Sequence, residues 1–160
     1  MEITFDFNTL LEEVKRSLSV IGKRTVDDNG NKLFSDITVS SNEESIISDY
    51  FRQAVIDLAA ELAAHITTPA NAEGTTIAID LPSNHDTAIE PFIRDACKAY
   101  CVSYALYSWF TVTAPRISEK YNADCSRQVN SVIRLVNQKS EPDAPASSYA
   151  DISGTVTPNN

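Results

Sequence analysis

Residues 91–112, PFIRDACKAYCVSYALYSWFTV, form the helical pattern from which the arrangement of the other predicted elements follows. Pro91 suits the first turn of an α-helix, and the charged side chains Arg94, Asp95 and Lys98 lie in its first half. Beyond Lys98 the segment is apolar nearly all round a helical wheel. A helix without a polar face is buried on every side. The segment therefore predicts a central helix against which the other elements pack.

An amphipathic helix is predicted ahead of this one, over residues 10–21. Thr9 and Glu12 have the spacing of a capping box, and Gly22 suits the left-handed position that follows a helix. The next residues change to turn chemistry, because Asp28-Asn29-Gly30 favours the positive φ angles of a tight turn. A small β-hairpin or an ordered loop is expected between residues 23 and 40.

A second, longer helix is predicted to begin at a capping box formed by Ser41 and Glu44. Apolar residues keep helical spacing from Ile46 to Ile66, and no residue interrupts the pattern before Pro69. At a rise of 1.5 Å per residue such a helix is about 35 Å long. One face of this helix is expected in the core.

One half-buried strand is predicted over residues 75–81. Ile77, Ile79 and Leu81 alternate there with polar or small residues. A lone strand needs a partner, and three candidates remain open: the stretch 3–7, the expected hairpin, or another copy of the protein.

The fourth predicted helix, residues 115–139, has two different faces. Its apolar residues lie within roughly 120° of one another on a helical wheel: Ile117, Tyr121, Cys125, Val129, Val132 and Val136. The segment carries a net charge of +3 and the rest of the chain −12. Four basic residues fall within about 40° opposite the apolar side: Arg116, Lys120, Arg127 and Arg134. This stripe predicts contact with an acidic neighbour or a passing nucleic acid, or else a solvated outer face.

Residues 140–160 differ in composition from the rest. They contain three of the seven prolines together with many small polar residues. Such a segment cannot offset the entropy of ordering by burial of its own. We therefore predict a helical domain over residues 1–139 and an extended or disordered arm over 140–160. Tyr149 and Ile152 are the expected contact residues if the arm lies on a neighbouring copy.

The overall charge, the N-terminal sequence and the length of the apolar runs argue against several classes of protein. A net charge of −9 repels phosphate backbones and anionic membranes, which disfavours general DNA binding. The first residues show no secretory signal, and the longest charge-free run, 99–115, is too short and polar for a membrane span. An intracellular protein without a membrane partner is expected.

Residues that often carry chemistry do not form a recognised motif. Cys97, Cys101 and Cys125 allow a three-thiolate zinc site in principle, but we expect reduced, buried and metal-free thiols. His65 and His85 are interpreted as capping or surface residues. The glycines do not form a phosphate-binding loop. A ridge of tyrosines is assigned to the core rather than to a ligand platform: Tyr100, Tyr104 and Tyr107. No cofactor and no enzymatic activity are expected.

The order of these parts resembles the small helical adaptor, or head-tail connector, proteins of tailed bacteriophages and prophages. The resemblance covers about residues 8–142 and is a pattern of helices and apolar positions. The matching stretches are Leu10-Leu11-Glu12-Glu13-Val14-Lys15, Ile37-Thr38-Val39-Ser40, Glu43-Glu44-Ser45-Ile46-Ile47-Ser48-Asp49-Tyr50, Glu90-Pro91-Phe92-Ile93, Tyr107-Ser108-Trp109-Phe110 and Ser140-Glu141-Pro142.

The resemblance implies a non-enzymatic virion subunit, made in the bacterial cytoplasm and located in the neck between capsid and tail. Copies of it would form a ring that docks on the portal protein, extends the DNA channel without sequence-specific binding, and meets neck or tail proteins. The main rival class is a cytoplasmic helical protein-binding module of unrelated role, and an enzyme without a short motif is third.

Overall fold

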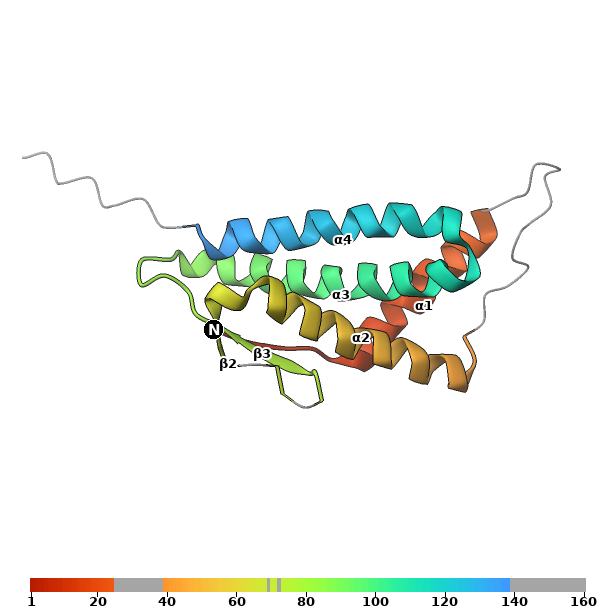
Figure 1. Cartoon of the computed structure of the whole chain (residues 1–160), viewed down its shortest axis with the longest axis horizontal. Coiled ribbons are helices and arrows are strands. Elements are labelled where there is room, and N and C mark those ends of the chain that lie inside the picture. The colour runs from red at the N-terminus through yellow and green to blue at the C-terminus, as the bar shows by residue number, and fades with distance from the viewer. Residues whose placement is uncertain (25–38, 69, 72, 139–160) are drawn as a thin grey trace, which may run out of the picture.

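The computed structural model describes residues 1–24, 39–68, 70–71 and 73–138. Over these residues the chain forms four α-helices, two short 3₁₀ turns and a three-stranded sheet (Figure 1). The predicted class, a mainly α fold with a small β element, is confirmed. The expected hairpin turn at 28–30 and the arm, with Tyr149 and Ile152, lie outside the described residues.

Helix α3 (Glu90–Thr113) is the central helix that its sequence predicts. It packs against α4 (Pro115–Val136), α2 (Ser41–Glu61) and α1 (Phe7–Arg24). Only Ala114 separates α3 from α4, so the two helices form a tight antiparallel pair (Figure 1). Eight residues of α3 are buried: Ile93, Ala96, Cys97, Tyr100, Cys101, Ala105, Leu106 and Phe110.

Helix α1 begins earlier and ends later than its capping pattern predicts. The carboxylate of Asp6 accepts a hydrogen bond from the backbone N–H of Asn8 at 3.1 Å and one from the Thr9 hydroxyl at 2.6 Å. Asp6 therefore satisfies the first turn, and Thr9 lies inside the helix. Gly22 is also helical, because α1 continues to Arg24. The predicted start at Thr9 and end at Gly22 are both wrong.

Helix α2 is shorter than predicted and begins one residue away from the expected cap. Its capping box joins Ser40 and Glu43, and the Ser40 backbone N–H donates to Glu43 Oε2 at 2.7 Å. The helix ends at Glu61, and a 3₁₀ turn (Ala63–His65) leads into strand β2 (Ile66–Thr68). The prediction of helix up to Ile66 is wrong, because this stretch pairs with a strand that follows it in the chain.

The sheet has the strand order β1-β3-β2, and both pairings are antiparallel. Strand β3 (Thr76–Ile79) is central, and its Ile77 and Ile79 are buried as the alternation predicts. Strand β1 (Glu2–Thr4) confirms one of the three candidate partners, since Ile3 lies opposite Ile77. Strand β2 was not predicted.

The turn before β3 depends on Gly74. Its φ of +66° is a left-handed conformation, and a Cβ there would lie 3.1 Å from the Cα of Arg52 on α2. Asn71 supports the same turn, because its side-chain oxygen accepts from the backbone N–H groups of Thr75 and Thr76 at 2.7 and 3.1 Å. The turn thus lies directly against α2.

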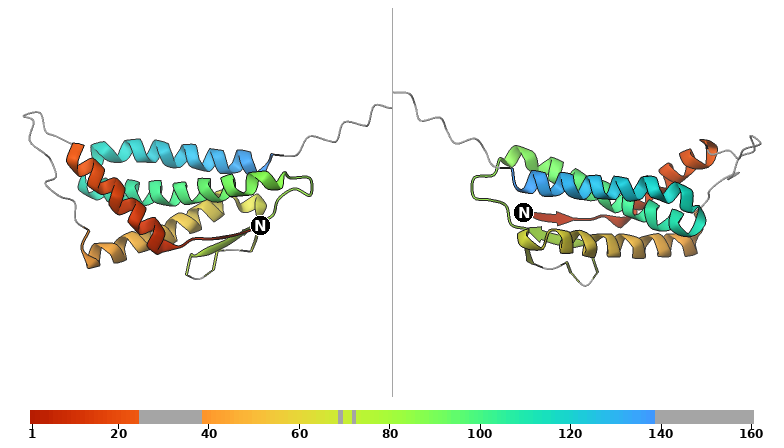
Figure 2. Two further views of the ribbon diagram at one scale, coloured as in Figure 1. Left: turned by 180° about the vertical axis from the view of Figure 1, so that it is seen from behind. Right: turned by 45° about the horizontal axis from the view of Figure 1, so that its top comes forward.

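The elements form layers around one core. Helix α4 covers one side of α3, whereas α2 and the sheet lie on the other side, and α1 crosses obliquely (Figures 1 and 2). The largest fully buried side chains come from every layer except α4 and β2, and include Phe5, Leu18, Phe51, Ile77 and Phe110. No helix within the described ranges is long and apolar enough to cross a bilayer.

Candidate functional site

Helix α4 shows the two faces that its sequence predicts. Its inner face packs on α3, where Tyr121, Cys125, Val132 and Val136 are buried. The ring of Tyr121 stacks on Phe110 of α3, with centroids 5.6 Å apart. This packing fixes the rotational orientation of α4 about its own axis. The opposite face is therefore turned towards solvent.

The basic stripe consists of Arg116, Lys120, Arg127 and Arg134, and all four residues are exposed. Arg127 donates to the Asp124 carboxylate at 2.8 Å, an ion pair of two residues on the same helix. The Lys120 Nζ lies 5.4 Å from the centroid of the Tyr121 ring. Arg116 and Arg134 form no ion pair with any residue of the described ranges. The structure thus places the whole predicted stripe on one open face.

The stripe adjoins two shallow hollows near the end of α4. Arg127 and Arg134 line one of about 450 Å³, and Arg134 and Leu135 help to line a second of about 380 Å³ that extends to α3. Phe92 borders the second hollow and is 63% exposed. A large exposed aromatic residue beside arginine is typical of a protein-binding surface. Phe92 was not among the predicted contact residues, because its exposure becomes evident only in the structure.

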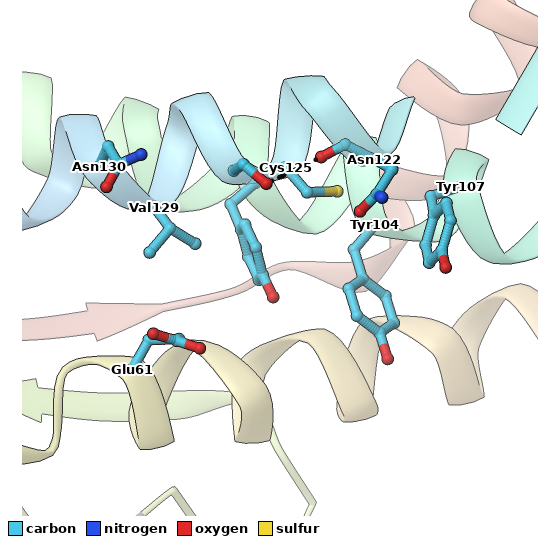
Figure 3. A pocket seen from close by; sticks show the side chains of 9 residues that line it. Glu61, Tyr104, Tyr107, Asn122, Cys125, Val129 and Asn130 are labelled. Atoms are coloured by element: carbon cyan, nitrogen blue, oxygen red, sulfur yellow. Dashed lines mark hydrogen bonds between the residues drawn. The ribbon is translucent and has the colours of Figure 1, made fainter. Parts of the chain in front are cut away.

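The tyrosine ridge is divided between the core and a surface hollow. Tyr100 is buried, whereas Tyr104 and Tyr107 are half-buried. The ring centroids of Tyr100 and Tyr104 are 5.9 Å apart, and those of Tyr104 and Tyr107 are 6.4 Å apart. The three tyrosines line a hollow of about 360 Å³ between α2 and the α3–α4 pair (Figure 3). The predicted core assignment holds for Tyr100, and the other two rings face the hollow.

The hollow in Figure 3 has neutral and acidic walls. Glu61 borders it from α2, and Asn122 and Asn130 border it from α4. Burial, followed by the hydrogen bond to Asp57, raises the pKa of the Tyr104 hydroxyl to about 12. These walls contain hydrogen-bonding groups but no histidine, lysine or arginine. The hollow suits a neutral polar or aromatic group better than an anion.

The three cysteines are buried and are not linked by disulfides. Burial raises the pKa of the Cys97 thiol to about 12 and that of Cys101 well above its usual value. Burial and the nearby Asp124 raise the pKa of Cys125 to about 12. Protonated thiols are poor nucleophiles and poor metal ligands at neutral pH. Among the described residues, no group of three His, Cys, Asp or Glu side chains is placed to hold a metal ion.

His85 has a structural position at the start of α3. Its Nδ1 lies 3.1 Å from the carbonyl oxygen of Pro82, and its Nε2 lies 3.1 Å from Glu90 Oε1. The ring thus ties the loop before α3 to the first turn of the helix. The backbone carbonyl of His65 accepts from the Asp80 N–H at 2.6 Å, which joins β2 to the end of β3. The side-chain contacts of His85 agree with the predicted capping role, whereas the contact of His65 is made by its backbone.

Comparison of the chain with family models, with curated proteins and with solved structures gave no significant match in any of the three.

Proposed function

We propose that this chain is a structural subunit of a bacteriophage head-tail connector, an adaptor that forms a ring beneath the portal and extends the DNA channel towards the tail. Two features support the proposal. The first is the resemblance of residues 8–142 to adaptor proteins. The second is the pairing of an exposed basic face with a strongly acidic remainder, which suits an association between copies.

The exposed stripe on α4 is the observation that carries the proposal. Four basic residues share one open face, while the opposite face of the same helix is buried against α3. The chain outside residues 115–139 carries a net charge of −12. Opposite charges on different surfaces of one subunit favour a head-to-tail contact, and such a contact closes into a ring when the rotation between copies allows it.

A protein neighbour explains the stripe better than DNA does. Persistent phosphate contact by four side chains is opposed by the negative field of the rest of the subunit. Phe92, exposed beside Arg134, adds an apolar anchor that a phosphate backbone does not need. In the proposed ring, the stripe therefore meets an acidic surface of the next copy or of the portal. DNA passes through the channel without base-specific contacts.

The mass of the assembled particle tests the proposal. The chain is purified alone, and also mixed with the portal protein of the genome that encodes it, and both samples are measured by light scattering after size exclusion and by electron microscopy. A ring, or a portal with added copies on one end, is the expected result. A monomer or dimer that does not bind the portal protein would instead favour the alternative function, a helical protein-binding module.

A further inference from the structure

Strand β2 leaves one edge of the sheet open in the described part of the chain. The sheet order places β2 at the edge, and β2 pairs with β3 alone. Thr67 and Thr68 are exposed. An unpaired strand edge is a template for the addition of another extended segment, because its outward N–H and C=O groups need partners. The sheet therefore offers backbone hydrogen bonds on this side.

An apolar hollow of about 530 Å³ lies between α2 and this strand. Ile56 of α2 borders it and is 48% exposed. Its other lining residues are small or apolar except for Thr67: Ala59, Ala60, Ala63, Ile66 and Ala70. Alanines leave room for larger side chains that enter from outside. A segment added to β2 would thus find both an open backbone edge and a place for alternate side chains.

The arm contains a segment with the pattern that such a site requires. Ala150, Ile152 and Val156 recur at period two, with Gly154 between them. The intervening residues are polar: Asp151, Ser153, Thr155 and Thr157. Strict alternation over eight residues is typical of a strand with one apolar face. Ile, Val and Thr also favour extended backbone.

The proposed ring favours a neighbouring copy as the source of this segment, because a strand given to the next copy joins two subunits. The described chain ends just after α4, which packs on α3, and the sheet lies across α3 from α4 (Figures 1 and 2). The arm therefore starts across α3 from the sheet, at the end of the molecule where β2 also lies (Figure 1). Residues 139–149 span at most about 36 Å when extended, which is slightly more than the length of α4 at about 33 Å. That reach does not distinguish β2 of the same copy from β2 of a copy packed alongside, and only a contact with the second links subunits in a ring.

We propose that residues 150–157 of one copy add as a strand to the free edge of β2 in the next copy, with Ile152 placed in the hollow between α2 and β2. This inference rests on the proposed ring, and it names the contact that links its subunits. Donor and acceptor lie on different surfaces, as a head-to-tail ring requires. Each subunit then gives one strand and receives one.

A mixed disulfide tests the contact directly. Ile152→Cys is made in one sample and Ala60→Cys, an exposed position of the hollow, in a second sample with a different mass tag. The samples are assembled together, with portal protein where assembly needs it, and oxidised. A disulfide between the two tagged chains is expected. Asp151→Cys is the matched control, because its side chain points to the opposite face of the added strand, and the unchanged chain shows that the buried native thiols stay unlinked.

A second pair of variants measures the contribution of the contact. Ile152→Asp should weaken association between copies by about tenfold or more, the change expected when one buried aliphatic side chain is lost. Ser153→Asp adds the same charge one residue away, on the polar face, and should change association far less. Both variants should keep the melting temperature of the monomer.

The outcomes separate this inference from the proposed function. Normal assembly by Ile152→Asp, with no mixed disulfide, overturns the strand addition and leaves the connector role intact. An intramolecular disulfide in a chain that carries both cysteines shows that the arm folds back on its own copy, which also overturns the proposal. Failure of the unchanged chain to assemble, with or without portal protein, removes the connector role and this contact together.

Discussion

Helices α3 and α4 lie side by side and have similar lengths, yet they use their surfaces in opposite ways. Between Ala99 and Phe110 every residue of α3 is buried or half-buried, and its charged residues lie near its start. Helix α4 buries one face only and presents the basic stripe on the other. Because of this difference, substitutions in the buried part of α3 should affect folding, whereas substitutions on the outer face of α4 should affect association.

The largest expected effect comes from Phe110→Ala in α3. Phe110 is fully buried and stacks on Tyr121 of α4, so its removal leaves a cavity between the two helices. The free energy of unfolding should fall by about 3–5 kcal/mol. Urea denaturation measures the change. Val112→Ala is the control on the same helix, since Val112 is 78% exposed and should change stability by no more than about 0.5 kcal/mol.

A smaller loss is expected from Cys101→Ser. Cys101 is fully buried in α3, and a hydroxyl there replaces a weakly polar thiol in an apolar site. Stability should fall by about 1–3 kcal/mol. Cys125→Ser on α4 should cost less, because Cys125 is not fully buried and borders the tyrosine-lined hollow. Equal losses at the two positions would contradict the contrast between the helices.

Alkaline pH should destabilise the chain through the thiol of Cys97. This thiol has its pKa raised to about 12 by burial, from a usual value of 9.0. Between these values the unfolded thiol loses its proton while the folded one keeps it, so stability falls as pH rises above 9. At pH 9.5 the loss from this group is about 1 kcal/mol relative to pH 7. Cys97→Ala should lack this part of the pH dependence in parallel urea titrations.

The smallest effect on folding, and a clear effect on association, is expected when Arg127 and Arg134 are both changed to Glu. Both side chains point away from the buried face, and the ion pair of Arg127 with Asp124 is exposed. Stability should change by about 0.5 kcal/mol or less per site. Binding between copies or to portal protein should weaken strongly at low salt and less at high salt.

Changing Arg52 and Arg94 to Glu is the matched control for that pair. Both are exposed on other helices, and each forms an ion pair with a nearby residue of its own helix. This double variant changes the net charge of the chain by the same amount as the α4 double variant. Association that falls equally for both double variants would mean that net charge alone acts. Normal association of the α4 variant at every salt concentration would leave the stripe as a solvated face.

Much of this organisation could be predicted from the sequence because it depends on local periodicity. The apolar run after Lys98 determines that α3 is central, and Pro115 separates it from α4. Helical spacing determines both faces of α4, so the sequence alone predicts that the four stripe residues share one exposed face. Alternation likewise determines that Ile77 and Ile79 are buried.

The remaining features were decided by contacts between distant segments, which periodicity does not encode. Ile66 fits the helical spacing of α2, but it pairs with Ile79 and becomes part of strand β2. Tyr100 and Tyr104 lie one turn apart on the same helix, and only the position of α2 and α4 makes one buried and the other half-buried. The hollow beside β2 exists because α2 stops at Glu61 and the chain turns back along the sheet. The pairing of strands and the enclosure of hollows depend on where other elements pack, so they follow from the tertiary structure and not from local sequence.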